Sequence, residues 1–197
     1  MNKVDLVVLG FLMRTPMHGY QIAEFFEKRG IEFWVKIKMP SVYKALNRLE
    51  EKVHITGEVE IDTSNRARKV YSITDSGREY FQEMLDEIFF SEKFVNPFDF
   101  WNAFRFLDKN INREYFEKMI NHRKLMMQDH WKKMHEKRKD CEGDIESTNI
   151  PFYVKMLMES LHKRGKEEFE LLDEMMAASA LPENANAFKN IDEENKI

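Results

Sequence analysis

Apolar side chains recur at helical spacing in the segment MPSVYKALNRLEEK, which covers residues 39–52. Four of them share the side of a helix that would face a core: Val42, Ala45, Leu46 and Leu49. Pro40 suits the first turn of a helix, and Ser41 can cap it. The pattern therefore predicts a helix from Pro40 to Lys52. Its other faces carry five polar or aromatic side chains: Ser41, Tyr43, Lys44, Asn47 and Arg48.

The flanking residues predict the rest of a small domain. Helical periodicity covers about residues 3–13 and 18–29, and a further helix begins near Thr74. Between the helix at 40–52 and the helix that begins near Thr74, alternating segments predict two strands, at about 56–61 and 69–73. They are joined by turn and basic residues at 62–68. Three helices followed by a two-stranded wing form a winged helix-turn-helix. We expect this mainly α domain to occupy residues 1–90 and to bind DNA.

The surface of the 40–52 helix and the hairpin beside it suit a nucleic-acid groove. Asn and Arg can read base edges in the major groove, whereas Lys more often contacts phosphate. Three cations in the hairpin fit the contacts of a wing: Arg66, Arg68 and Lys69. The alternative is that all these polar residues form an ordinary solvated surface. Two roles for Tyr43 stay open, a hydrogen bond to phosphate or packing of its ring under the second helix.

From residue 91 onward the pattern is wholly helical. We expect a compact aromatic helix from Asn96-Pro97 to about 108, a long helix from about 112 to 141, and a last helix from Pro151 to about 179. The apolar stripes of the two long helices are too wide for one antiparallel pair to cover. Residues 91–180 are therefore expected to form a helical dimerisation domain of a homodimer. The polar, acidic residues 181–197 are expected to be a disordered tail.

Composition and charge limit the classes of protein that fit. The chain has 197 residues, a net charge of −4 and a single cysteine, Cys141. One cysteine cannot form an intrachain disulfide, and no apolar run is long enough to span a bilayer, so a cytoplasmic location is expected. The acidic total argues mildly against nucleic-acid binding. However, residues 36–69 carry eight basic and five acidic side chains, and the local field at a docking face decides phosphate contacts.

The sequence gives little support for an enzyme active site, a cofactor site or a metal site. No phosphate-binding glycine loop, nucleophile elbow or HExxH motif occurs, so we expect neither an enzyme nor a cofactor. His122, His130 and His135 lack the spacing and partners of a metal site. Five aromatic residues between 98 and 106 have two interpretations, an aromatic core, which we favour, or a pocket for an aromatic or hydrophobic effector. These are Phe98, Phe100, Trp101, Phe104 and Phe106.

Three segments together resemble the PadR family of bacterial transcriptional regulators. They are LGFLMRTPMHGYQIAEFF, MPSVYKALNRLEEK and RARKVYSITDSGREY, which occur in the family's order and spacing. The resemblance covers about Val4 to Leu85, and the helical remainder is similar to the C-terminal dimerisation domain of the longer members. One departure is visible: Val53 stands where the family often has Gly, so the turn after the helix is either less strained or placed differently.

The resemblance implies a dimeric winged helix that binds a palindromic operator, usually as a repressor, and that in some members is released by a phenolic or multidrug-type compound. It places five residues on the recognition helix: Ser41, Tyr43, Lys44, Asn47 and Arg48. It places three on the wing: Arg66, Arg68 and Lys69. His18, Gly19 and Tyr20 match the family's His-Gly-Tyr, with Tyr20 expected to bury most of its ring. The alternative function is a protein-interaction adaptor whose winged helix does not bind DNA.

Overall fold

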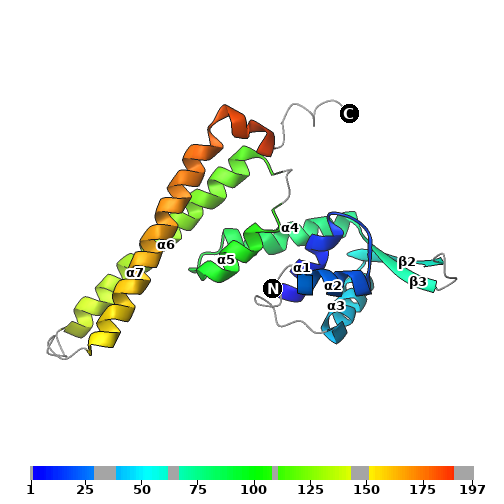
Figure 1. Cartoon of the computed structure of the whole chain (residues 1–197), viewed down its shortest axis with the longest axis horizontal. Coiled ribbons are helices and arrows are strands. Elements are labelled where there is room, and N and C mark those ends of the chain that lie inside the picture. Colours follow the sequence, from blue (N-terminus) through cyan, green and yellow to red (C-terminus); the bar gives the residue numbers. More distant parts are fainter. Residues whose placement is uncertain (1, 29–38, 62–66, 108–110, 143–150, 189–197) are drawn as a thin grey trace. The chain divides into compact units, whose positions relative to one another are not determined.

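The computed structural model describes residues 2–28, 39–61, 67–107, 111–142 and 151–188. The chain divides into two compact units (Figure 1). The first unit comprises residues 1–88 and 95–106, and the second comprises residues 89–94 and 107–197. The chain therefore passes from the first unit to the second, returns, and passes across again.

Three helices form the body of the first unit, as predicted: α1 (Lys3–Leu12), α2 (Gly19–Lys28) and α3 (Met39–Glu51). Asn2 caps α1 by accepting a hydrogen bond from the backbone amide of Val4. The apolar stripe of α3 packs against α1 and α2, and its four predicted core positions are fully buried. Burial of the large apolar side chains in this small unit is its main source of stability.

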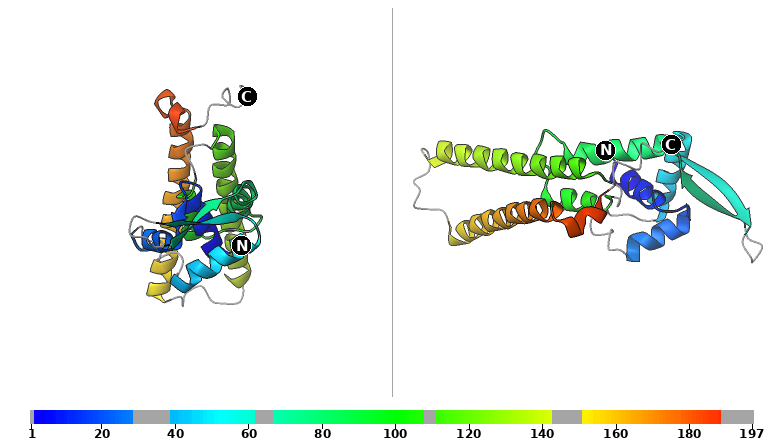
Figure 2. Two further views of the ribbon diagram at one scale, coloured as in Figure 1. Left: turned by 90° about the vertical axis from the view of Figure 1, so that its right-hand side faces the viewer. Right: turned by 90° about the horizontal axis from the view of Figure 1, so that it is seen from above.

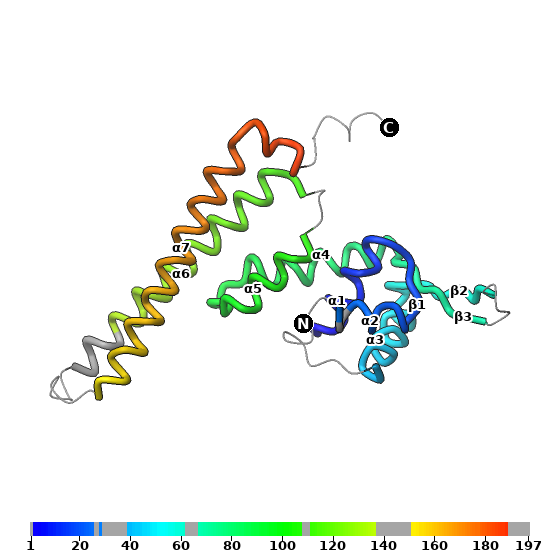
Figure 3. The backbone as a smooth tube through the Cα atoms, viewed as in Figure 1, coloured from blue at the N-terminus to red at the C-terminus, as the bar shows by residue number. Residues whose placement is uncertain are grey.

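A three-stranded antiparallel sheet completes the winged helix. β2 (Ile55–Ile61) and β3 (Ala67–Ile73) form the hairpin, with Ile55 opposite Ile73 and Ile61 opposite Ala67. A two-residue strand, β1 (Met17–His18), pairs with β3, so the sheet order is β1-β3-β2 (Figure 3). The strand β1 is not predicted by the sequence, because two residues are too short for a periodic signal. The predicted fold class, mainly α with a winged helix, is confirmed.

The helices α4 (Asp75–Phe89) and α5 (Pro97–Phe104) follow the hairpin. Within the predicted dimerisation domain of residues 91–180, residues 95–106 belong instead to the first unit. The reason is close packing on α1: a Cβ added to Gly10 would lie 2.4 Å from Cδ1 of Phe106, and Lys3 Nζ bonds Asp99 at 2.5 Å. The glycine in α1 thus makes room for an aromatic ring of the segment that follows α5.

The second unit is built on two long helices, α6 (Arg113–Glu142) and α7 (Phe152–Ser179), which lie side by side in both views of Figure 2. Arg123 is buried between them and donates to the carboxylate of Glu168 from Nε at 3.1 Å and from Nη2 at 2.8 Å. The guanidinium also lies 4.8 Å from the ring centroid of Phe94. This contact fixes the short segment 89–94 onto α6.

The expected disordered tail is partly ordered. A 3-10 helix, η2 (Pro182–Ala187), follows α7, and the ring of Phe188 lies 5.5 Å from that of Phe116. Packing of this aromatic ring stabilises the ordered position of the polar segment that precedes it. Composition alone does not reveal such a contact. Residues 189–197 lie outside the described residues. Within the part of the chain that the structure describes, no helix is long and apolar enough to cross a membrane.

Candidate nucleic-acid interface

The outer face of α3 presents polar side chains beside the hairpin. Tyr43, Lys44 and Asn47 are exposed, and Ser41 is half-buried near the start of the helix. The opposite face holds the buried apolar stripe, so this surface is fixed in orientation by the core. The described part of α3 therefore offers a hydroxyl, an ammonium and a carboxamide, the groups that donate to phosphates and base edges in a DNA groove.

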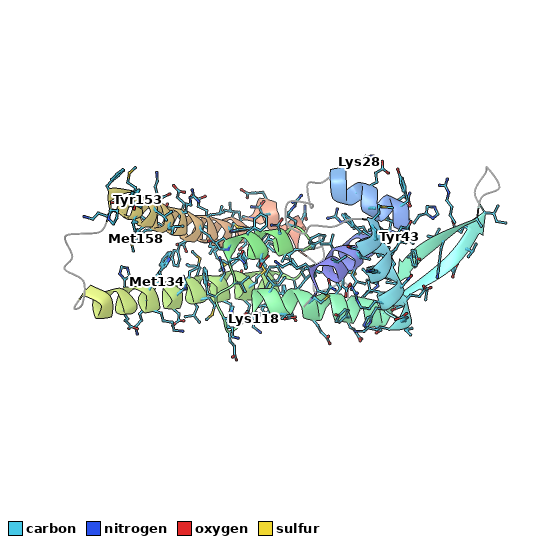
Figure 4. The ribbon with its side chains drawn as sticks, turned by 90° about the horizontal axis from the view of Figure 1, so that it is seen from below. Lys28, Tyr43, Lys118, Met134, Tyr153 and Met158 are labelled. Carbon is cyan, nitrogen blue, oxygen red and sulfur yellow. The ribbon has the colours of Figure 1, made fainter. Side chains whose placement is uncertain are left out.

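Tyr43 lies against the first turn of α2 (Figure 4). A Cβ added to Gly19 would stand 2.8 Å from Cε1 of Tyr43, so only glycine permits this approach without displacing the ring. The side chain nevertheless keeps 42% of its surface exposed. Of its two open roles, the structure shows the packing contact directly, and the exposed remainder leaves the ring's other side on the surface.

The His18-Gly19-Tyr20 segment begins α2. The backbone amide of His18 donates to Oε1 of Gln21 at 2.9 Å, and His18 itself belongs to β1. The expectation that Tyr20 buries most of its ring is wrong, since 66% of the residue is exposed. Its neighbour Gly19 occupies the close-packed position instead, against Tyr43 and Leu46 of α3, and the tyrosine remains on the surface.

Arg48 is tied to the first helix. Its Nε donates to Oδ2 of Asp5 at 3.1 Å, and its Nη2 bonds the other carboxylate oxygen. Asp5 is 3% exposed, although it lies in an otherwise apolar helix. The hydrogen bond to Asp5 raises the pKa of Arg48, against an opposing effect of burial. The guanidinium predicted to contact DNA is thus engaged with a buried carboxylate, and its geometry fits a residue that positions α3.

Lys69 is likewise engaged within the protein. Its Nζ lies 2.7 Å from a carboxylate oxygen of Glu50 on α3, and 5.4 Å from the ring centroid of Tyr71. The hydrogen bond to Glu50 is the main reason that the pKa of Lys69 is raised. The Lys69 side chain crosses Gly57 on the way: a Cβ there would lie 2.1 Å from Cε of Lys69. The pair joins the wing to α3.

Of the other two predicted wing cations, the structure describes only one. Arg68 is exposed on β3 and lies in register with Glu60 on β2. Arg66 lies outside the described residues. Across residues 55–73 the sequence holds three acidic and three basic side chains. The hairpin as a whole is therefore electrically balanced, and the local positive excess comes from the residues before it.

The turn after α3 is not less strained than a glycine turn, although valine stands where the family often has glycine. The amide of His54 donates to Leu49 O and that of Val53 to Glu50 O, both at 2.9 Å, which is the hydrogen-bond pattern of a Schellman helix end. Val53 has a φ of 61°, in the left-handed region that glycine adopts without strain. The helix therefore ends as a glycine-containing sequence would, with a β-branched residue held in a strained conformation.

Several residues that shape this surface were not singled out from the sequence. Asp5, Glu50 and Gly57 determine where Arg48 and Lys69 point. Asp5 had a usable signal, because a carboxylate within the apolar run KVDLVVLGFL predicts a buried charge that needs a partner. The pairing of Lys69 with Glu50 depends on the hairpin register and had no comparable signal.

The histidines and aromatic residues of the remaining candidate sites have structural contacts. His122 Nε2 lies 2.9 Å from Ser91 O, and the His130 ring stacks on Phe94 at 4.1 Å. Among the described residues no cluster of three or more His, Cys, Asp or Glu is arranged to hold a metal ion. Phe100 is buried in the first unit and Phe98 is 52% exposed. The buried ring fits the aromatic-core interpretation.

The three helices, the short sheet and the exposed outer face of α3 together define a winged helix-turn-helix domain. Residues 8–83 match the model of the transcriptional regulator PadR-like family. This region of the chain is therefore similar to the PadR-like family, as the resemblance in the sequence indicated. Proteins of that family are described as transcriptional regulators, not as enzymes.

Individual relatives are similar over different parts of the chain. The negative transcriptional regulator PadR of Bacillus subtilis (strain 168) is 28% identical over 85 residues, which is 43% of this chain and 46% of that protein. The chain thus spans about half the length of the curated relative that it matches. A crystal structure of Bacillus subtilis PadR in complex with operator DNA is 18% identical, covers 90% of this chain and 99% of its own, and gives a TM-score of 0.42. A transcriptional regulator from Clostridium thermocellum is 30% identical over 43% of this chain and 78% of its own, with a TM-score of 0.38.

Proposed function

We propose that the protein is a sequence-specific DNA-binding transcriptional regulator. The observation that carries the proposal is the outer face of α3, where Lys44 and Asn47 are exposed beside the hairpin while the opposite face is locked into the core. An exposed helix of this kind enters the major groove, and the adjacent wing contacts the flanking backbone. The match of residues 8–83 to the model of the transcriptional regulator PadR-like family supports the same function.

The contacts of this face divide by chemistry. Asn47 has the paired donor and acceptor that match an adenine edge, and Lys44 supplies a point charge for phosphate. Ser41 and the exposed side of Tyr43 offer hydroxyls that reach phosphate oxygens. We propose Arg66 and Arg68 as wing contacts to the DNA backbone. Arg48 and Lys69 act differently in this proposal, because their ion pairs with Asp5 and Glu50 hold α3 and the wing in place.

A homodimer is the second part of the proposal. α7 exposes five large apolar side chains in its first ten residues, between 56% and 74% accessible: Phe152, Tyr153, Met156, Leu157 and Leu161. Tyr153, Leu157 and Leu161 follow one another at four-residue spacing and so share a face of the helix. A second copy of the chain would cover this face. Two winged helices related by a two-fold axis then match a palindromic operator.

A mobility-shift assay tests the function. The probe is a set of labelled duplex fragments from the region upstream of the protein's own gene, with ionic strength varied. Retardation should weaken steeply as salt rises. The variant K44A should bind more weakly with a shallower salt dependence, and N47A should lose preference among fragments. K132A, which removes an exposed lysine from α6, serves as the matched control. No retardation of any fragment at micromolar protein would refute the proposal.

Repression and release by an effector extend the proposal. Repression predicts that a reporter driven by the bound fragment rises when the gene for the protein is deleted, whereas activation predicts a fall. An aromatic or hydrophobic effector near the segment 98–106 predicts quenching of Trp101 fluorescence and loss of the shifted band. A compound that leaves both signals unchanged is not the effector.

The alternative, an adaptor that binds another protein, draws on two observations. The hairpin is electrically balanced, and α7 exposes a wide apolar face. An adaptor predicts that K44A and N47A have no effect on the partner that the protein captures, and that no upstream fragment is retarded. The same shift assay therefore separates the two functions.

A further inference from the structure

The two faces of the wing differ in chemistry. Side chains alternate between the faces of a strand, and residues in register on an antiparallel pair share a face. One face of the hairpin therefore carries Ile55, Gly57, Val59 and Ile61 with their partners Ile73, Tyr71, Lys69 and Ala67. The other face carries Thr56, Glu58 and Glu60 with Ser72, Val70 and Arg68. Within residues 55–61 and 67–73, both carboxylates thus lie on one face and none on the other.

The carboxylate-free face is the one turned toward the recognition helix. Its inner residues Ile55 and Tyr71 are buried against the core, and Lys69 crosses it at Gly57 to reach Glu50 of α3. Farther along, the hairpin reaches beyond the helices of its unit (Figure 1). There Val59 and Ile61 are 68% and 71% exposed. An apolar pair thus continues the surface that α3 presents.

From this arrangement we infer that Val59 and Ile61 form an apolar contact surface for duplex DNA, against the deoxyribose edges that line the minor groove. The inference rests on the proposed function and specifies how the wing takes part in it. Apolar side chains, isoleucine among them, are a recurrent means of contact in the minor groove. The C–H groups of the sugars form the walls of that groove. The face is suited to this partner because it continues from α3, and the Glu50 carboxylate that lies against it at Gly57 is paired with Lys69.

The charge balance of the hairpin supports the same conclusion. Lys69 is engaged with Glu50, and the three acidic side chains of residues 55–73 offset the three basic ones. A wing of this composition gains little affinity for DNA from the attraction of its charges to phosphate alone. Burial of two β-branched side chains supplies affinity that does not depend on salt.

The test replaces both residues by threonine, which keeps the β-branched shape and strand preference but adds a hydroxyl. Affinity is measured by fluorescence anisotropy of the wild-type chain and of V59T/I61T on the upstream fragment that the wild type retards, over a range of salt. The double variant should bind on the order of tenfold more weakly. Its slope of log affinity against log salt should equal that of the wild type, whereas K44A should have a shallower slope.

The matched control is E58T/E60T, which makes the same kind of change on the opposite face of the same strand. It should bind at least as tightly as the wild type, because it removes two carboxylates. Melting temperatures of all variants should stay close to the wild type, since the replaced side chains are exposed.

Three outcomes overturn the inference. If the wild type binds but V59T/I61T binds equally well, the apolar pair does not contact DNA, although the proposed function stands. If V59T/I61T loses self-association in sedimentation while its DNA affinity is kept, the face pairs with a second copy through β2, the edge strand. If the wild type retards no fragment, the proposed function and this inference fail together.

Discussion

The carboxylate of Asp5 on α1 accepts hydrogen bonds from the Nε and Nη2 of Arg48 on α3. The acid is almost fully buried, whereas the arginine side chain retains 37% of its surface. This asymmetry matters because a buried charge that loses its partner cannot return to water, whereas a partly exposed one can turn outward. The pair joins the first helix to the recognition helix by chemistry that cannot be read from the apolar stripe.

Removing Arg48 and removing the charge of Asp5 should lower the stability of the protein by unequal amounts. R48M leaves the Asp5 carboxylate buried without its partner and should lower the free energy of unfolding by about 2–3 kcal/mol. D5N leaves an amide in place and frees Arg48 toward solvent, and should cost about 1 kcal/mol. Urea unfolding followed by circular dichroism measures both. Equal losses, or a larger loss for D5N, would contradict the asymmetry.

The strained end of α3 should be improvable by one substitution. Val53 has a φ of 61° and is 63% exposed, so V53G removes backbone strain while giving up little buried surface. Strain of this type is worth about 1–3 kcal/mol, and the extra freedom of glycine in the unfolded chain offsets part of it. V53G should therefore unfold at a higher temperature than the wild type. V53A, which keeps a Cβ, should gain less, and a melting temperature of V53G at or below that of the wild type would argue against strain.

Much of this fold could be predicted from the sequence because its signals are local. The stripe of α3 and the starts at Pro40 and Pro97 depend on residues a few positions apart, and the helices begin within a residue or two of the expected places. The strand β1 and the return of α5 to α1 could not be predicted, since both depend on partners far along the chain. The same limit applies to the candidate site. Exposure of Lys44 and Asn47 follows from periodicity, but the partners of Arg48 and Lys69 follow from tertiary contacts.

Lys69 should titrate above its ordinary value while its partner is present. Glu50 raises the pKa of Lys69 from 10.5, mainly through the side-chain hydrogen bond. A raised pKa means that the pair's contribution to folding is fully present below pH 10.5 and is lost as the pH rises through the folded value. NMR titration of the Lys69 Cε signal should give a pKa above 10.5 in the wild type and a lower one in E50Q. A pKa that is unchanged in E50Q would show that the ion pair is absent in solution.

Gly57 should be needed for this ion pair. An added methyl group would lie 2.1 Å from Cε of Lys69 and 2.8 Å from Oε1 of Glu50, so G57A must displace the bridge between wing and helix. The Lys69 pKa in G57A should then fall toward that in E50Q, while Lys28, which pairs with Glu24 on α2, should be unaffected and serves as the internal control. If G57A keeps the wild-type pKa of Lys69, the side chain has another route to Glu50.

The apolar face of α7 gives the sharpest test of assembly. Leu157 and Leu161 are 58% and 56% exposed and one turn apart, so L157E/L161E places two charges on the surface that we propose a second copy covers. Burial of an unpaired carboxylate in such an interface is strongly unfavourable, and the variant should sediment as a monomer at concentrations where the wild type is a dimer. K155E introduces a glutamate at an exposed polar position of the same helix and should leave the dimer intact. A wild-type chain that sediments as a monomer would contradict the proposed homodimer, whereas an L157E/L161E variant that remains dimeric would place the interface elsewhere. Loss of the dimer should also weaken binding to a two-site fragment far more than binding to a single half-site, because only the two-site complex depends on joining two winged helices.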